Sequence, residues 1–381
     1  MMATIKPYDT AAGKRYRVRY RKPDGAQTDK RGFKTKKEAE LFLASTTISK
    51  ATGDYVDPQA GKITIGQLGP TWLAGKKSVV KVSQYASLES SWRTHVQPEW
   101  ADRAVASIKK SEVQTWIADL RGRRSATVVL RAHGILAGIL DSAMHDGRIS
   151  KNQARAVQLP RKGRAGKTYL THDQLQRLAA ASKYPTLMLV LGYTGLRWGE
   201  VSALRVKHVN QVRRRFSIEE NAVLVGSVIH PGTPKTHEHR TVPYPRVLAR
   251  RIRELCEGRD PNELLFGDGT HYMRLPHPSH SWLNEAARKA REQREREVAA
   301  AKAAGRKLVL TPVPTVSVHE LRHTAASLAV SSGANPKAVQ RMLGHASAAM
   351  TLDTYADLFE DDLDGVADRL SAAAEKAGLA A

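Results

Sequence analysis

The second half of the chain carries six side chains whose types and order could together act on a phosphate group. They are Arg197, Lys235, His319, Arg322, His345 and Tyr355. Arginine, lysine and histidine donate charge-assisted hydrogen bonds to phosphate oxygens, so five of the six could bind an oxyanion. A tyrosine hydroxyl can act as a nucleophile and form a covalent intermediate. The set therefore predicts phosphoryl transfer, with the tyrosine as the attacking group.

The charge of the whole chain points to a nucleic acid as the source of that phosphate. Lys plus Arg number 61 against 37 Asp plus Glu, which gives a formal net charge of +24. Such an excess predicts a polyanionic partner, either DNA, RNA or an anionic membrane surface. We expect no membrane partner, because the longest apolar run, Leu187 to Leu191, is too short to span a bilayer. The single cysteine, Cys256, fits a reducing compartment.

Short motifs around Arg197 and Lys235 predict local structure. The stretch TGLRWGE at 194–200 predicts a tight turn that leads into a helix, where the Glu200 carboxylate could brace Arg197. The stretch PKT at 234–236, followed by RTVP at 240–243, predicts a lysine in a hairpin turn between two strands. An ion pair at a helix start and a lysine in a turn are each common surface features, so neither motif indicates catalysis by itself.

The segment HELRH at 319–323 is compatible with two different chemistries. On a helix, His319 and His323 share a face and match the pattern of zinc hydrolases, with Glu320 as general base. Alternatively, His319 and Arg322 donate to one phosphate, and His323 is a buried structural histidine. The basic chain, the arginine beside the would-be metal and the absence of a third-ligand signature favour the phosphate interpretation.

The first 60 residues predict a compact basic module. The stretch RYRVRYR at 15–21 has the period of a β-strand, with Tyr16, Val18 and Tyr20 on one face. The opposite face would carry four arginines, Arg15, Arg17, Arg19 and Arg21. The turn sequence KPDG predicts a hairpin, and Thr35 with Glu38 predicts the capped start of a short helix. We expect the arginines to contact DNA; a solvated edge strand protected by its charges is the alternative.

Two linker-like segments divide the remaining chain. DYVDPQAGK at 54–62 and PRKGRAGK at 160–167 predict domains at 1–60, 63–159 and 168–381. The middle domain reads as helical, with a capping box at Ser111 and Gln114 before one of its helices. Its helices present two apolar stripes, Val113, Trp116, Ile117 and Leu120, and then Val129, Ala132, Leu136, Ile139, Leu140 and Ala143.

The sequence of the third domain predicts helices around a few strands. A capping box at Thr171 and Gln174 opens it, and a strand-rich patch covers about 216–244. Residues 288–307 are almost all charged residues and alanine, which predicts an exposed helical insertion. After Tyr355 the charge inverts, since seven acidic and two basic residues give 2 − 7 = −5.

With these motifs the chain resembles the tyrosine recombinases, specifically phage integrases. TGLRWGE, the PKT lysine, HELRHTAASL, MLGHAS and TLDTYADL follow the family's order and approximate spacing. Residues 63–159 resemble the core-binding domain, and residues 1–60 resemble the arm-type DNA-binding domain. The resemblance implies a mainly α fold with small β-sheets: an N-terminal β-hairpin and helix, a helical (SAM-like) core-binding domain and a mixed α+β catalytic domain. Gln153 and Trp100 depart from the family pattern, outside the chemistry.

The resemblance implies that Tyr355 attacks a DNA phosphorus, forms a 3′-phosphotyrosyl bond and releases a 5′-hydroxyl. A phenol with a pKa of about 10 is mostly protonated at neutral pH, so it must lose its proton during attack. Arg197 and Arg322 would stabilise the two non-bridging oxygens, and His345 would add a hydrogen bond.

His319 would donate or accept a proton near the tyrosine, and Lys235 would protonate the leaving 5′ oxygen. No metal or other cofactor is expected, because the cations are side chains and the phosphotyrosyl bond conserves the energy for religation. The second shell would include Glu200 and His323.

The implied partners are double-stranded DNA at phage and host attachment sites and three further copies of the chain, in a homotetramer. An excisionase and a host DNA-bending protein are candidate accessory partners, and the expected place is the nucleoid in the cytoplasm of a bacterial host. The acidic tail is expected to dock on a neighbouring protomer. Alternatives are a chromosome-dimer resolvase or type IB-like topoisomerase, a non-catalytic DNA-binding regulator, and the zinc hydrolase. The basic module at 1–60 argues against the resolvase.

Overall fold

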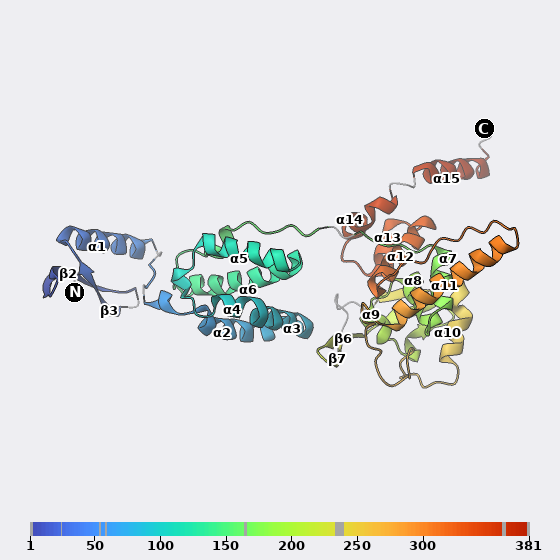
Figure 1. The fold of residues 1–381 in the computed structure, drawn as a ribbon, viewed down its shortest axis with the longest axis horizontal. Coiled ribbons are helices and arrows are strands. Elements are labelled where there is room, and N and C mark those ends of the chain that lie inside the picture. The colour runs from blue at the N-terminus through green and yellow to red at the C-terminus, as the bar shows by residue number, and fades with distance from the viewer. Residues whose placement is uncertain are drawn as a thin grey trace. The chain divides into compact units, whose positions relative to one another are not determined.

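The computed structural model describes residues 3–23, 25–52, 55–57, 59–163, 166–232, 240–359 and 363–378. Contacts divide the chain into Met1–Arg164 and Ala165–Ala381, which we call the N-terminal unit and the C-terminal unit. The boundary lies inside the predicted linker at 160–167. Both units are mostly helical with small antiparallel sheets (Figure 1), which confirms the predicted fold class.

The N-terminal unit begins with a three-stranded sheet and one helix. These elements are β1 (Thr4–Thr10), β2 (Gly13–Arg21), β3 (Gln27–Phe33) and α1 (Lys36–Ala51). The pairing of β2 with β3 confirms the predicted hairpin, and Thr35 caps α1 by accepting from the Glu38 N–H. The predicted short helix is in fact 16 residues long. The sequence pattern does not predict β1, because Pro7 interrupts it; β1 is an edge strand, where proline is tolerated.

The two faces of β2 differ as its alternating sequence predicts. Val18 and Tyr20 are buried and pack with Ala39 of α1 in a small core. The other face carries Arg15, Arg17, Arg19 and Arg21. Lys6 of β1 and Arg31 of β3 lie opposite Arg17 in the register, and directly opposed residues share a face. All three strands therefore contribute cations to one surface, which we call the arginine face.

The rest of the N-terminal unit is a helical domain. Its helices are α2 (Ile65–Lys77), α3 (Val82–Ser91), α4 (Gln97–Trp100), α5 (Lys110–Arg123) and α6 (Ala126–His145). Both predicted apolar stripes are buried in its core, namely Val113, Trp116, Ile117, Leu120, Val129, Ala132, Leu136, Ile139, Leu140 and Ala143. These stripes therefore form the hydrophobic core of the domain.

The predicted capping box of Ser111 and Gln114 is wrong. Helix α5 is capped two residues earlier, where the Lys109 N–H donates to the Glu112 carboxylate at 2.9 Å. A carboxylate is a stronger acceptor than an amide, so Glu112 fixes the helix start. The Gln114 side chain instead binds the backbone of Gln158, near the end of the domain. It accepts from the Gln158 N–H at 2.8 Å and donates to the Gln158 carbonyl at 3.2 Å.

Helix α6 is long and apolar enough to cross a membrane by length and composition alone. Half of its apolar window is nevertheless buried inside the domain, and Ile135, Leu136 and Ile139 are completely buried. We therefore interpret α6 as the core helix of this domain. Its packing explains why an apolar helix of 20 residues occurs in so basic a chain.

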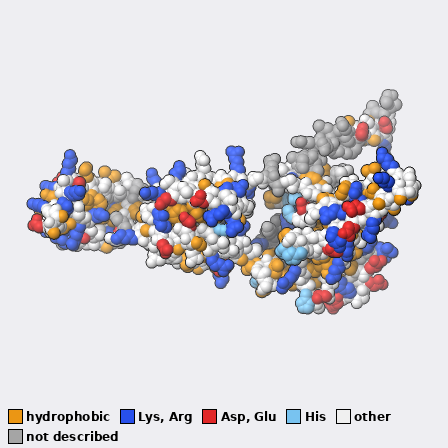
Figure 2. Space-filling view, in the orientation of Figure 1, with side chains coloured by type: hydrophobic (Ala, Val, Ile, Leu, Met, Phe, Trp, Pro, Cys, Tyr) orange, Lys and Arg blue, Asp and Glu red, His pale blue; other side chains and the backbone are white. Residues whose placement is uncertain are grey.

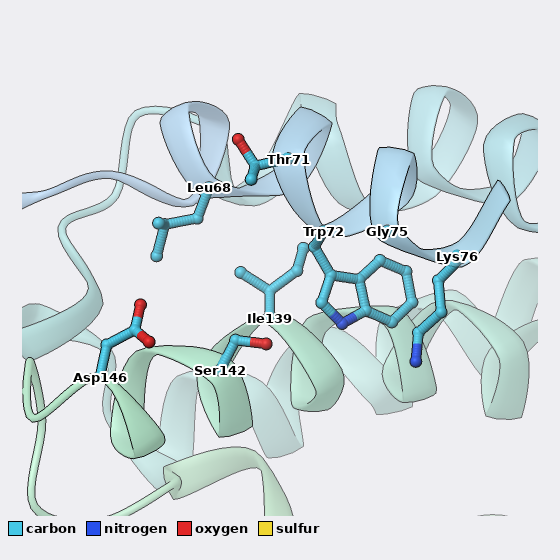
Figure 3. Close-up of a pocket in the computed structure, with 8 residues that line it drawn as sticks. All are labelled: Leu68, Thr71, Trp72, Gly75, Lys76, Ile139, Ser142 and Asp146. Atoms are coloured by element: carbon cyan, nitrogen blue, oxygen red, sulfur yellow. The ribbon is translucent and has the colours of Figure 1, made fainter. Parts of the chain in front are cut away.

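A pocket lies between α2 and the C-terminal part of α6 (Figure 3). It is lined by Leu68, Thr71, Trp72, Gly75, Lys76, Ile139, Ser142 and Asp146. The Trp72 ring lies between the two helices, and the Lys76 Nζ is 5.0 Å from the centroid of that ring. A Cβ atom at Gly75 would meet nothing within 4 Å. The pocket thus leaves free space beside one glycine of α2.

Alanine at Gly69, also in α2, is expected to destabilise the helical domain by about 1–3 kcal/mol. Its Cβ would lie 2.2 Å from an atom of the Trp92 ring, which is buried. Gly75→Ala is the matched control, and we expect it to be neutral or to stabilise the domain by up to about 1 kcal/mol. Chemical denaturation of both variants measures the difference. Equal stabilities would contradict the prediction and show that the Trp92 ring moves aside freely.

The C-terminal unit combines helices with two small sheets. Its helices are α7 (His172–Ala180), α8 (Pro185–Thr194), α9 (Trp198–Ser202), α10 (Ala249–Cys256), α11 (Trp282–Ala303), α12 (Val318–Ser331), α13 (Pro336–Leu343), α14 (Ala348–Phe359) and α15 (Leu363–Lys376). Its strands are β4 (Val209–Asn210), β5 (Arg215–Ile218), β6 (Asn221–Val225), β7 (Val228–Gly232) and β8 (Arg240–Pro243). Helix α8 packs against α7 and α12, and the predicted capping box of Thr171 and Gln174 is present.

The strands that flank Lys235 belong to different sheets. Strand β7 pairs with β6, whereas β8 pairs with β5, so the described strands do not form the predicted hairpin across this lysine. Lys235 itself lies outside the described residues. The segment resembles a hairpin in sequence because two short strands flank it. The sequences of such short strands do not indicate which strand each one pairs with.

The predicted exposed insertion at 288–307 is only half correct. Helix α11 does carry charged side chains outward, but Ala286, Ala290 and Ala301 are buried on its other side. Glu297 pairs with Arg177 of α7 at 2.7 Å. The alanines therefore form a packing face, and the helix is part of the unit's framework. Lys and Arg side chains are visible over much of the surface (Figure 2), in keeping with the net charge of +24.

Candidate active site

Arg197 lies at the turn between α8 and α9, as predicted. Gly195 ends α8 in the left-handed conformation (φ +65°), and a Cβ there would lie 2.6 Å from Leu343. The Arg197 N–H and Nη1 both donate to the Glu200 carboxylate, at 2.9 and 3.0 Å. Glycine thus permits a tight turn, and the carboxylate fixes the guanidinium that follows it.

A second arginine, Arg240 at the start of β8, binds the same carboxylate. Its Nη1 and Nη2 donate to the two Glu200 oxygens at 3.0 and 2.7 Å, and the Glu200 side chain is only 2% exposed. Burial raises the pKa of Glu200, but the hydrogen bonds and charges of Arg240 and Arg197 lower it more, so that the net shift is downward. Glu200 is therefore an anion shared by two guanidinium groups.

Arg240 was not among the predicted site residues. It lies 40 residues from Glu200 in the sequence. The only available signal was its place in RTVP directly after the PKT lysine, and an arginine at a strand start is common. A Cβ at Gly344 would lie 2.8 Å from the Arg240 Nε, so the backbone before His345 packs directly on this arginine.

Arg322 projects from α12 into the same region and is 3% exposed. Its two terminal nitrogens donate to backbone carbonyls, Nη1 to Gly195 at 2.6 Å and Nη2 to Leu343 at 2.7 Å. Arg197 donates to the neighbouring Gly344 carbonyl at 3.2 Å. Burial and then the charge of Arg197 lower the pKa of Arg322 to about 10, which still leaves it charged at neutral pH. Both guanidinium groups therefore donate to carbonyls at the carboxyl end of α13, where the partial negative charge of the helix end favours cations.

His345 follows Gly344, the residue that caps the end of α13. Its Nδ1 lies 2.9 Å from the Thr351 Oγ1, and its ring is nearly parallel to the Tyr355 ring at 6.3 Å. Burial, followed by the charges of Arg322 and Arg197, lowers the pKa of His345 to about 4. The ring is therefore neutral at physiological pH and keeps one N–H for donation.

Tyr355 lies in α14 at a break in the helix, with φ −126° and ψ 25°. It is 1% exposed, and its ring packs with Ala326, Leu343 and Val339. Burial raises the pKa of Tyr355, and the charge of Arg322 offsets only part of this shift. The hydroxyl is consequently protonated in the DNA-free protein.

The hydroxyl of Tyr355 contacts His323, the residue that follows Arg322. The His323 Nδ1 lies 2.9 Å from the Tyr355 oxygen, whereas His319 makes an edge contact with the His323 ring at 4.8 Å. His323 is half-buried, and its predicted role as a buried structural histidine does not account for this contact. In the described part of the chain no three His, Cys, Asp or Glu side chains are grouped so that they could hold a metal ion.

Lys167, in the segment that opens the C-terminal unit, also reaches the tyrosine. Its Nζ contacts the Thr354 carbonyl oxygen and lies 5.3 Å from the Tyr355 ring centroid. The two residues are almost 190 positions apart, and the lysine was predicted only as part of a linker. Five of the six predicted residues thus lie together, while Lys235 is not described.

Comparison with known families agrees with this arrangement. Residues 168–361 match the model of the phage integrase family, and residues 8–49 match an arm DNA-binding domain. The chain belongs to the phage integrase family. It is a DNA-binding enzyme of the tyrosine recombinase type, and it catalyses site-specific DNA recombination. The arm match covers β2 and β3, which carry most of the arginine face, and nearly all of α1.

Related integrases share the length of the chain at low identity. The integrase of Mycobacterium phage D29 is 25% identical over 338 residues, which cover 84% of each protein. A prophage phiRv2 integrase of Mycobacterium tuberculosis is 27% identical over 357 residues, covering 89% of this chain and 88% of the relative.

Two solved structures show that the fold is shared. The Tn1549 transposon integrase in complex with transposon right end DNA has a TM-score of 0.58 and 22% identity, covering 81% of this chain and 99% of that chain. A lambda integrase tetramer bound to a Holliday junction has a TM-score of 0.53 and 17% identity, covering 90% and 96%.

Proposed function

We propose that this integrase cuts and rejoins DNA through a covalent bond between Tyr355 and a 3′-phosphate. One observation carries the proposal: two buried or half-buried guanidinium groups meet at the carboxyl end of α13, beside the tyrosine. Arg322 and Arg197 donate there to adjacent carbonyls, and His345 stacks on the Tyr355 ring. A phosphate has two non-bridging oxygens, which match two guanidinium forks in charge and geometry.

In the proposed reaction, Tyr355 attacks the phosphorus and the 5′ oxygen leaves. Arg197 and Arg322 stabilise the charge that grows on the non-bridging oxygens, and His345 donates one further hydrogen bond. Lys235 protonates the departing 5′ oxygen, which would otherwise leave as an alkoxide. Religation reverses these steps on the 5′-hydroxyl of a second DNA. Side-chain cations supply the positive charge that the transition state requires.

A cleft beside the site supports binding of a DNA backbone. This cavity of about 700 Å³ lies between α13 and strands β5 and β8, and His345 is one of its lining residues. Arg215, Arg240 and Arg341 line it as well. Three guanidinium groups around one opening favour an anionic chain, such as the sugar–phosphate backbone on either side of the cleaved bond.

The experiment that tests the proposal uses nicked DNA from the region that flanks the gene, in fragments that the protein binds specifically. Incubation in EDTA is expected to give a protein–DNA adduct that survives denaturation, with Tyr355 as the linked residue. Absence of any adduct on specifically bound DNA, together with zinc in the purified protein, would instead support a hydrolase.

The biological setting is part of the same proposal. The domains at 1–60, 63–159 and 168–381 would bind arm-type sites, bind core sites and catalyse, respectively. The substrates would be phage and host attachment sites, joined in a homotetramer whose acidic tails dock on neighbouring protomers. The enzyme would act inside a bacterial cell at the nucleoid, with an excisionase and a DNA-bending protein setting direction.

The arginine face gives a prediction for the N-terminal module. Changing Arg17 and Arg19 to glutamine is expected to weaken DNA binding and to lower the salt dependence of log K by about 1.8, since each lost phosphate contact contributes about 0.9. The control, Lys14→Gln with Lys30→Gln, removes the same charge from the other face of the sheet. Lys30 lies opposite Val18 in the register, and Lys14 is an even number of residues from Val18 in the same strand. Binding titrations at several salt concentrations measure both pairs; equal effects would show that the module acts only through its net charge.

A further inference from the structure

The hydroxyl of Tyr355 has a hydrogen-bond partner that the assigned reaction does not use. The His323 Nδ1 lies 2.9 Å from the phenol oxygen, and the tyrosine is sealed from solvent at 1% exposure. A buried phenol cannot hand its proton to bulk water, and its raised pKa makes spontaneous ionisation rarer still. A proton acceptor within hydrogen-bond reach is therefore required for attack.

Other groups around Tyr355 are less suited to accept that proton. The His345 ring lies parallel to the phenol ring, and its Nδ1 is engaged with Thr351. Lys167 lies over the ring face, and Arg322 donates to two carbonyls; both are cations with no acceptor to offer. His319 contacts the ring of His323 from its edge. Geometry thus favours His323 among the described residues.

We propose that His323 is a catalytic residue that accepts the proton of Tyr355 during attack and returns it during religation. The proposal rests on the phosphotyrosyl reaction proposed above. The Tyr355 oxygen–phosphorus bond forms while its proton passes to the His323 Nδ1, and the phosphorus–5′ oxygen bond breaks as Lys235 protonates that oxygen. In religation the histidine, now an imidazolium, protonates the departing phenolate.

The electrostatics of α12 are suited to this role. Burial, followed by the charges of His319, Lys167 and Arg322, lowers the pKa of His323 to about 4, although Glu320 opposes the shift. The ring is consequently neutral before DNA binds, as an acceptor must be. A bound phosphate would offset the charge of Arg322 and raise the pKa of His323, so basicity would increase when the substrate is in place.

The direct test separates proton transfer from positioning. His323→Asn keeps a hydrogen-bond acceptor near the tyrosine but cannot carry the proton, so the single-turnover rate of adduct formation is expected to fall by about 10²–10⁴. Replacing Tyr355 with a fluorinated tyrosine lowers the phenol pKa and reduces the need for a base. We expect this replacement to raise the rate of adduct formation by the His323→Asn variant at least about tenfold. The rate of the protein with His323 in place should change little.

His319→Asn is the matched control, since it changes the neighbouring histidine one helical turn away. Its defect is not expected to respond to the fluorinated tyrosine. An unchanged rate in His323→Asn, or rescue confined to His319→Asn, would overturn the proposal. Thermal melting and DNA binding confirm that each variant is folded, with His323→Gln as a second variant if asparagine destabilises α12. Failure of the unmodified chain to form the Tyr355 adduct would refute the phosphotyrosyl reaction itself.

Discussion

Tyr355→Phe is expected to abolish covalent attachment to DNA while the protein stays folded and binds DNA. The substitution removes only the phenolic oxygen, which is the proposed nucleophile; the ring keeps its packing against Ala326, Val339 and Leu343. Loss of the hydrogen bond to His323 should lower the unfolding free energy by about 1 kcal/mol. Denaturing gels measure the adduct, and thermal melting with a binding assay checks the fold.

Tyr193→Phe provides the control for this experiment. It removes a hydroxyl of α8 in the same unit, at a partly exposed site, whose described hydrogen bond is to His172 at 3.0 Å. Cleavage by this variant should be unchanged. An adduct in Tyr355→Phe would show that another residue is the nucleophile. No difference between the wild type and Tyr355→Phe in any recombination assay would support the non-catalytic regulator.

Glu200→Ala is expected to lower both the unfolding free energy and the cleavage rate. The carboxylate is 2% exposed and holds Arg197 and Arg240 together. Without it, two guanidinium groups are left close together with no anion between them, which typically costs about 3–5 kcal/mol. Arg197 would also lose its bracing, so we expect cleavage to fall by about 100-fold or more.

The control is Glu220→Ala, which removes a partly exposed carboxylate that pairs with Arg205 at 3.4 Å. Exposed pairs contribute at most about 1 kcal/mol, so its effect should be small. Urea denaturation of both variants and adduct assays make the comparison. Similar losses in the two variants would show that the buried cluster has no special role.

The same carboxylate gives a pH dependence with a definite sign. The pKa of Glu200 in the folded protein is below its ordinary value of 4.5. Its contribution to stability is therefore present above pH 4.5 and is lost as the pH falls through the lower folded pKa. The stability difference between wild type and Glu200→Gln should shrink over that acid range; a difference that is independent of pH would contradict the assignment.

Much of the fold follows from local patterns in the sequence. Alternation in RYRVRYR predicts a strand with one apolar and one cationic face, because successive side chains of a strand point to opposite sides. The stripe that includes Val113, Trp116 and Ile117 predicts a core-facing helix for the equivalent reason. Errors arose where two local choices compete, as at the start of α5, where Glu112 replaces the predicted cap.

By itself, the sequence determined which residues could do the chemistry and in what order they occur. The turn before Arg197, its bond to Glu200 and the shared helix of His319 and Arg322 depend on neighbours a few positions away. Such contacts leave a signal in short motifs, because backbone geometry fixes the distance between residues three or four apart.

Tertiary structure alone decided how those residues are held. Arg240 reaches Glu200 over 40 residues, His323 reaches Tyr355 over 32, and Arg322 reaches the Gly195 carbonyl over 127. These contacts depend on how α8, α12, α13 and β8 pack, and packing is a sum of many weak interactions with no periodic trace in the sequence. The contact of His323 with the Tyr355 hydroxyl is therefore one that the short motifs do not predict.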